Sequence, residues 1–273
     1  MKKHRRKRKT SFFFAAISGA LFLVLSLNYP NWVPIFSKYL TIKIREVEPM
    51  LPAPSVREGA EQVLKSKGNA ILQRFSFDKG QDSLKVWEEK IFKGHTVFKV
   101  AQENGLCYLS SQSRDACSGL YVKTDLTATP ELWINWKWRV KEFPRKKHPE
   151  LLSNRAEDDF AARLYVIFLA SNFFKSDVME YIWDEKIRTG TVADSPYSER
   201  IKLLVIHTGP AGSEGGGWVE EERNIYEDYQ KLFGKAPSNP VGLVALMSDS
   251  NNTETEASAD FAEIILKRKI FKK

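Results

Sequence analysis

Apolar and polar residues alternate in many short segments after residue 70, and this period of two is typical of half-buried β-strands. The clearest case is residues 132–140, LWINWKWRV, in which apolar residues occupy every second position. Asn135, Lys137 and Arg139 stand between them, so the segment has one apolar and one polar face. An antiparallel sheet that covers a core on one side produces this pattern.

Other segments are apolar on both faces and therefore predict central strands. They are residues 160–170, 201–207 and 241–248, with residues 260–268 expected to close the sheet. Residues 224–233 are the clear helix candidate, because apolar side chains recur at helical spacing and Gly234 and Pro237 follow. Many strands separated by loops predict a mainly β fold, an antiparallel jelly-roll-like β-sandwich with one or two short helices.

The N-terminal part has a different pattern, a basic tail followed by an uncharged stretch from residue 11 to residue 37. The apolar centre of this stretch is Phe12–Leu27, and flanking neutral residues extend it to the roughly 20 residues of a bilayer-spanning helix. Cleavage of a signal peptide requires small residues just after the apolar run, and residues 26–32 offer no suitable pair. The sequence therefore favours a transmembrane signal anchor at residues 11–32 over a cleaved signal peptide.

The formal net charge of +8 belongs almost entirely to the N-terminal tail. Of the 42 Lys and Arg residues, seven are among the first nine residues, which leaves 35 against 34 Asp and Glu. A globally basic nucleic-acid-binding domain is thereby excluded, and no nucleic-acid partner is expected. The positive-inside rule places the tail, residues 1–10, in the cytoplasm and the bulk of the chain on the other side of the membrane.

A proline-containing segment, residues 33–70, separates the membrane segment from the β-rich region. Its prolines favour an extended stalk or linker, in which residues 56–67 can form a short helix. The folded β-sandwich domain then comprises residues 71–273. Its two cysteines, Cys107 and Cys117, can form a disulfide in an oxidising compartment or be two small buried apolar residues. The predicted topology favours the disulfide.

Two segments carry polar and aromatic residues suited to ligand contact. In the first, Asp159 and Arg163 fall on one strand face, close enough to pair, either as a structural ion pair or as part of a ligand-binding face. In the second, Trp218 follows a glycine-rich loop and precedes Glu222 and Arg223. That arrangement suits a sugar-stacking surface, although a hairpin loop with the tryptophan in the core fits the same residues.

The loop at residues 249–254 offers oxygen ligands at alternate positions, so Asp249 and Asn251 are weak candidates for calcium ligands. The loop lacks the glycine and the final glutamate of an EF-hand, and a capped polar loop without a metal is the favoured interpretation. No other cofactor is expected, and no Cys/His cluster indicates zinc. Acids that could cleave a glycosidic bond are candidates by residue type only: Glu180, Asp184, Glu222 and Asp249.

Several of these segments, taken in order, resemble the bacterial family known as domain of unknown function 3047. They are residues 136–140, 158–165, 181–183, Trp218 with 222–225, 228–229, 233–234 with Pro237, and 247–253. The resemblance spans roughly residues 75–266 and implies bacterial origin and export, without an established activity. In this family's acidic loop, an acid and a glycine stand where this chain has Asn251 and Glu254, which weakens the calcium hypothesis. The C-terminal half also resembles the galactose-binding-like sandwiches of carbohydrate-binding modules, and such an analogy of fold does not determine function.

The sequence therefore predicts a single-pass protein of the bacterial inner membrane, with a cytoplasmic N-terminus and a periplasmic β-sandwich. We expect the sandwich to bind a glycan or envelope polymer without cleaving it. The expected ligand face consists of Asp159, Arg163, Trp183, Trp218, Glu222 and Arg223. One alternative is a structural or scaffold protein of the envelope, in which the polar cluster only holds the sandwich together. The other is a glycan-active hydrolase or lyase, which requires two carboxylates about 5–10 Å apart in a cleft.

Overall fold

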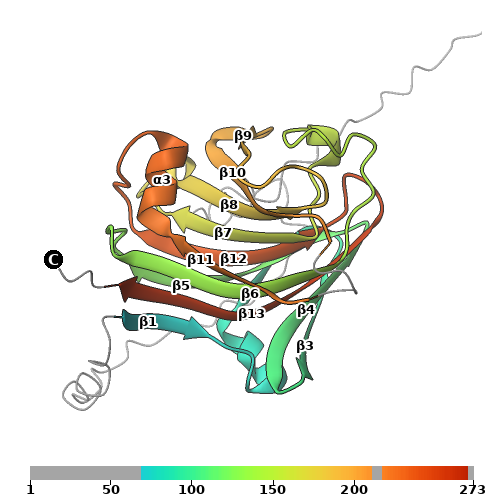
Figure 1. Cartoon of the computed structure of the whole chain (residues 1–273), viewed down its shortest axis with the longest axis horizontal. Coiled ribbons are helices and arrows are strands. Elements are labelled where there is room, and N and C mark those ends of the chain that lie inside the picture. Colours follow the sequence, from blue (N-terminus) through green and yellow to red (C-terminus); the bar gives the residue numbers. More distant parts are fainter. Residues whose placement is uncertain (1–68, 211–216, 270–273) are drawn as a thin grey trace, which may run out of the picture.

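Two β-sheets make up the part of the chain that the computed structural model describes, residues 69–210 and 217–269 (Figure 1). Sheet A has the strand order β11-β6-β13-β4-β3, with β1 also paired to β13, and sheet B has the order β2-β5-β12-β7-β8-β10-β9. The strands are β1 (Asn69–Phe75), β2 (Glu88–Lys93), β3 (Val97–Glu103), β4 (Leu106–Arg114), β5 (Cys117–Leu126), β6 (Leu132–Glu142), β7 (Ala162–Phe168), β8 (Asp177–Asp184), β9 (Val192–Ser195), β10 (Ser198–Thr208), β11 (Val219–Asn224), β12 (Val241–Asp249) and β13 (Glu256–Lys269). One α-helix, α3 (Ile225–Phe233), and three short 3₁₀ turns, Gly80–Val86, Arg155–Glu157 and Phe173–Lys175, join them.

The core lies between the two sheets and is rich in aromatic rings. Trp136 and Trp138 of β6 point inward from sheet A, as the alternation of residues 132–140 predicts, and both are fully buried. The Trp136 ring lies 5.3 Å from that of Tyr181, and the Trp138 ring lies 5.7 Å from that of Trp183, both from β8 of sheet B. Burial of rings this large is a major favourable contribution to folding, so these contacts hold the two sheets face to face.

Helix α3 covers one side of the sandwich, at the left in Figure 1. The Asn224 side chain caps its first turn by accepting hydrogen bonds from two backbone amides, and Gly234 ends it in a left-handed conformation with φ of 68°. Tyr229 packs on Phe168, with ring centres 4.5 Å apart, and its hydroxyl donates to Asp177 at 2.6 Å. The helix predicted at residues 224–233 is therefore confirmed.

The mainly β sandwich is also confirmed, with two corrections to the strand arrangement. Strands β8 and β10 are parallel, because β9 returns along the outer edge and lets β10 insert beside β8 in the same direction. Strand β13, expected to close a sheet, lies inside sheet A between β6 and β4. Hydrophobic periodicity reports which face of a strand is buried, and it carries no information about the neighbours of that strand.

The predicted disulfide is wrong, because both cysteines are free thiols. Cys107 lies near the start of β4 in sheet A, and Cys117 begins β5 in sheet B. The seven extended residues that follow Cys107 to the end of β4 carry the chain roughly 23 Å. A disulfide requires Cα atoms within about 7 Å, so short separation in sequence does not bring these thiols together.

The predicted basic tail, membrane anchor and stalk lie outside the described residues. Within residues 69–210 and 217–269, no helix is long and apolar enough to cross a bilayer.

Candidate functional site

The six residues expected to form one ligand face lie in three different environments. Trp183 is fully buried between the sheets, where its Nε1 donates to the Gly209 carbonyl at 2.7 Å, so it has no surface to offer a ligand. Arg223 points to the inner side of β11, where its guanidinium pairs with Asp228. The expectation of one shared face therefore fails, and the remaining four residues divide between two regions, one on each sheet.

The first region is a buried ion cluster, the Arg163 cluster, formed by Arg163, Asp158, Glu180 and Asp249 at one end of sheet B. Arg163 is 2% exposed and forms a two-point pair with Asp249, Nε to Oδ1 at 3.1 Å and Nη2 to Oδ2 at 3.0 Å. Its Nη1 donates to Glu180 at 3.1 Å, and its Nη2 donates to the Asp158 carbonyl. Pairing and hydrogen bonding of this kind are what make a buried guanidinium tolerable.

Asp159 does not take part in the pairing with Arg163 that its position in the sequence suggested. Strand β7 begins only at Ala162, so Asp159 lies before it and faces the loop after β12. Its carboxylate accepts hydrogen bonds from the backbone amides of Asn252 and Thr253, the latter at 2.6 Å, and from the Thr253 hydroxyl at 2.7 Å. Asp159 is therefore the residue that holds this loop closed.

The same loop was the weak calcium candidate, and the carboxylate of Asp249 is already engaged within the chain. Both carboxylate oxygens of Asp249 accept from Arg163, and Oδ1 also accepts from the Phe160 amide at 3.0 Å. The Asn251 side chain donates to Asn252 at 2.9 Å. Among the described residues, no three His, Cys, Asp or Glu side chains are grouped so that they could hold a metal ion.

Burial in the Arg163 cluster changes the acidity of its carboxyl groups. Loss of water raises the pKa of Glu180 to about 8 and that of Asp249 to about 7, and the attraction of Arg163 offsets only part of this. Glu180 Oε1 and Asp158 Oδ1 are buried without a hydrogen-bond partner. Burial thus raises the pKa of all three acids around the guanidinium, Asp158 included, and they are closed off from solvent.

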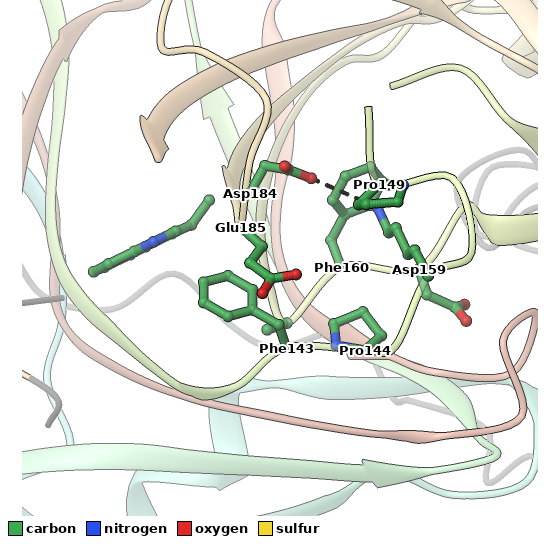
Figure 2. A pocket seen from close by; sticks show the side chains of 10 residues that line it. Phe143, Pro144, Pro149, Asp159, Phe160, Asp184 and Glu185 are labelled. Carbon is green, nitrogen blue, oxygen red and sulfur yellow. Dashed lines mark ion pairs between the residues drawn. The ribbon is translucent and has the colours of Figure 1, made fainter. Parts of the chain in front are cut away.

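A small hollow beside this cluster is drawn in Figure 2. The rings of Phe143, Pro144 and Phe160 surround it, and the dashed line marks the ion pair between Asp184 and Lys146, at 3.6 Å. Lys146 Nζ also lies 3.5 Å from the centre of the Phe160 ring. The hollow holds about 10 Å³, which is room for roughly one water molecule. It is too small to admit a sugar.

The second region, which we call the sheet A groove, is an open hollow of about 270 Å³ on the outer face of sheet A. Its lining comes from β1, β6, β11 and β13: Ile71, Asn135, Trp136, Lys137, Glu220, Glu263, Ile265 and Lys267. Lys137 Nζ lies 2.6 Å from Glu263 and 3.9 Å from Glu220. Asn135 is 9% exposed, and its Oδ1 is buried without a hydrogen-bond partner.

A β-bulge in β13 opens this groove. Ala262 is paired with Lys137 and Ile265 with Asn135, so two residues of β13 stand opposite the single residue Trp136. Glu263 is in the bulge and has a φ of 52°, a left-handed conformation that costs a residue with a side chain about 1–3 kcal/mol. Bulges and strained residues of this kind are concentrated at binding sites, because they redirect side chains and interrupt the regular ladder.

Two of the predicted ligand residues lie on the same outer face, next to the groove. Glu222 of β11 pairs with Lys267 and Lys269, and hydrogen bonds from both lysines outweigh burial and lower its pKa to about 2. Trp218 is partly exposed just before β11, with the Arg139 guanidinium 4.8 Å and the Tyr108 ring 5.4 Å from its ring. Trp218, Arg139, Lys137 and Asn135 thus form a continuous polar and aromatic strip along β6.

Sequence reasoning missed most of the groove. The alternation along residues 132–140 did place Asn135 and Lys137 on a polar face, and this was the one feature of the sequence that pointed to the groove. Glu220, Glu263 and Lys267 come to the groove through strand pairing and through the bulge. The positions of pairing and bulge depend on long-range contacts that no local pattern reveals.

Comparison with known proteins gives a family and several distant structures. No match was found among the curated proteins. A family 11 carbohydrate-binding module of the Clostridium thermocellum cellulase Lic26A-Cel5E matches with a TM-score of 0.39 and 12% identity, over 74% of this chain and 95% of that chain. The K3 adhesin domain of Lys-gingipain from Porphyromonas gingivalis matches with a TM-score of 0.35 and 12% identity, over 72% and 99%. The carbohydrate-binding module TmCBM27, described by its recognition of mannan, matches with a TM-score of 0.35 and 7% identity, over 74% and 98%.

Carbohydrate-binding modules thus occur among the matching structures. The family model for proteins of unknown function called DUF3047 matches residues 85–265, most of the described sandwich and well over half of the chain. The chain belongs to this family.

Proposed function

We propose that this protein is a membrane-anchored extracytoplasmic protein that binds an uncharged glycan on the outer face of sheet A without cleaving it. The observation that carries the proposal is the sheet A groove, an open hollow of about 270 Å³ that contains a buried acceptor without a partner, Asn135 Oδ1. Buried polar groups almost always have a partner in native proteins. A ligand that brings a donor to Asn135 would supply one.

The balance of charge in the groove favours a neutral ligand. Lys137 and Lys267 are matched by Glu220 and Glu263, so the formal charge of the lining is zero. An anionic polymer would meet the two carboxylates, and a cationic one the two ammonium groups. Hydroxyl groups both donate and accept, so a sugar can satisfy donors and acceptors together.

Trp218 extends the surface beyond the groove. Arg139, which lies next to Trp218, is two residues from Lys137 on β6, or roughly 7 Å along the strand. A flat aromatic ring at this distance can stack on a neighbouring sugar of the same chain while the groove holds another. The strip therefore suits a polymer better than a single sugar.

Binding without cleavage is supported by the state of the acids. Glu180 and Asp249 are buried and paired with Arg163. Asp184 faces Lys146 beside a hollow that has room for roughly one water molecule. Glu222 is neutralised by two lysines. A glycosidase needs one acid kept protonated and a second one free on the opposite side of an accessible bond, and these four acids do not form such a pair.

Membrane attachment rests on the N-terminal sequence. The basic tail, residues 1–10, and the apolar segment, residues 11–32, have the composition of a signal anchor, which places the sandwich on the periplasmic side of a bacterial inner membrane. A protease-protection assay on intact spheroplasts tests this, with loss of the sandwich as the expected result and protection as the contradicting one.

Affinity electrophoresis of the full-length protein through gels that contain neutral polysaccharides tests the binding proposal. We expect retardation by at least one polymer, and Trp218→Ala should weaken binding roughly fivefold because a stacking contact of this kind contributes about 1 kcal/mol. Phe174→Ala is the control, since Phe174 is an aromatic residue with a solvent-exposed side chain that lies at the sheet B side. If no neutral polymer retards the protein, or if both variants behave alike, the proposal is wrong.

A further inference from the structure

We propose that the sheet A groove recognises an acetamido group, so that its ligand is a glycan built from N-acetylated amino sugars. This inference rests on the proposed function and specifies the chemistry that the same site selects. It is carried by three features of the groove: the unpartnered acceptor on Asn135, the ammonium groups of Lys137 and Lys267, and the apolar wall formed by Ile71 and Ile265.

The acceptor defines the first requirement. Asn135 lies on the outer face of β6, nine-tenths buried, and its Oδ1 has no donor within the described residues. Lys137, two positions along the strand, has its ammonium directed to Glu263 at 2.6 Å. Asn135 therefore needs a donor from outside the described residues, and the N–H of an amide is the donor that backbone and side-chain carbonyls pair with throughout proteins.

The ammonium groups define the second requirement. Lys137 is held by Glu263, and Lys267 is held by Glu222 at 2.5 Å. Each ammonium carries three protons, so each retains donors after this pairing. The bulge at Glu263 keeps the Lys137 ammonium at the groove. An amide carbonyl that enters beside Asn135 meets a charged donor, and hydrogen bonds of this type are about twice as strong as neutral ones.

The apolar wall defines the third requirement. Ile71 of β1 is 40% exposed, although it is a large apolar side chain, and Ile265 of β13 lines the same hollow. A methyl group placed between them removes apolar surface from water. N–H, C=O and CH₃ are the three parts of an acetamido group, and the groove offers an acceptor, a donor and an apolar contact in one place.

Other substituents satisfy fewer of these features. A hydroxyl group can donate to Asn135, but it leaves the isoleucine wall without a partner. A free amine can also donate to Asn135, but as an ammonium group it would approach Lys137 and Lys267 and provide no methyl group. A carboxylate or phosphate would face the oxygen of Asn135 and the carboxylates of Glu220 and Glu263.

Three hexasaccharides with the same β-1,4 linkage separate these cases by titration calorimetry on the full-length protein: the hexamer of N-acetylglucosamine, the hexamer of glucosamine and cellohexaose. They differ only in the substituent on the second carbon of each ring. We expect the N-acetylated hexamer to bind at least about tenfold more tightly than the other two. Asn135→Leu removes the acceptor with little change in size and should reduce this preference to less than about twofold.

Gln112→Leu is the matched control, because Gln112 is an exposed polar residue on the same sheet, on β4, outside the groove. It should leave the preference unchanged, and thermal unfolding checks that both variants are folded. If cellohexaose or the glucosamine hexamer binds as tightly as the N-acetylated hexamer, the acetamido inference is wrong and glycan binding stands. If none of the three binds but another neutral polysaccharide does, the inference is also wrong. If no glycan binds at all, the inference and the proposed function fail together.

Discussion

The Arg163 cluster and the sheet A groove use the same kinds of side chain in opposite ways. Around Arg163, three donor atoms meet acceptors, and the four residues are at most 4% exposed. In the groove, Glu220 has a side chain 62% exposed, and the Asn135 acceptor is left without a partner. The first arrangement pairs its cation with buried carboxylates, whereas the second leaves charged side chains open to solvent.

The two regions differ because a loop covers the Arg163 cluster and no described segment covers the sheet A groove. The loop between β6 and β7 folds over the end of sheet B, and Phe160 stacks on Arg163 with the guanidinium carbon 4.4 Å from the ring centre. No described segment crosses the groove in this way, and the β13 bulge widens it. Charged residues on a strand thus become structural where a loop covers them and remain available where none does. Four predictions test this contrast.

The largest effect is expected for Arg163→Met. This change leaves Asp158, Glu180 and Asp249 buried without their cation, and the loss of one partner of a buried ion pair costs about 3–5 kcal/mol in the free energy of unfolding. Urea denaturation measures it. Lys137→Met on the open face is the control and should cost less than about 1 kcal/mol. Similar losses for both variants would contradict the contrast.

The second prediction concerns pH. Burial raises the pKa of Glu180 from 4.5 to about 8, so between these values the folded protein keeps a proton that the unfolded chain has released. Stability then decreases as the pH rises from about 5 to about 8, and urea midpoints across this range measure it. Glu180→Gln should reduce the dependence above pH 7, and the part that remains below it comes from Asp249, whose pKa burial raises to about 7. Glu222, with its pKa lowered to about 2, does not titrate in this range, so Glu222→Gln should leave the slope as it is.

A smaller loss is expected for Asp159→Ala. The change removes the acceptor for the amides of Asn252 and Thr253 and for the Thr253 hydroxyl, and donors left without partners cost about 1–3 kcal/mol in total. Asp159→Asn keeps one acceptor oxygen and should lose less than half as much in thermal unfolding. If the two variants are equally unstable, the charge of Asp159 matters more than its hydrogen bonds.

The smallest effect is expected for Glu222→Gln. Glu222 pairs with Lys267 and Lys269 on the open face, and solvent screens such pairs, so the free energy of unfolding should change by less than about 1 kcal/mol. Chemical denaturation in low and high salt measures it. A loss comparable to that of Arg163→Met would show that the open face contributes to stability as the closed cluster does.

Much of the sandwich was predictable because burial of a strand face is a local property. The inward direction of Trp136 and Trp138 and the outward direction of Lys137 follow from alternation alone, and the capping signals of Asn224 and Gly234 set the ends of α3. The errors concern relations between segments. Cys107 and Cys117 are close in sequence but belong to different sheets, and Asp159 faces a loop more than 90 residues away.

The candidate site shows the same difference between local properties and relations between segments. Trp218 and Glu222 were chosen for their residue types and do lie on an open face, whereas Arg163 and Trp183 were chosen in the same way and are buried. Residue type indicates what a side chain can bind. Whether it meets the chain or the solvent depends on which loop covers it, and the sequence pattern does not contain that information.

The sequence by itself determined the mainly β character, the faces of the strands, the helix at residues 224–233 and the location of the net charge in the N-terminal tail. These are local features, set by side-chain periodicity, capping and composition. Only the tertiary structure decided that Asp249 pairs with Arg163 and that a bulge at Glu263 opens a groove over Asn135. Strand order and register minimise the free energy of the whole pair of sheets, so no segment specifies them alone.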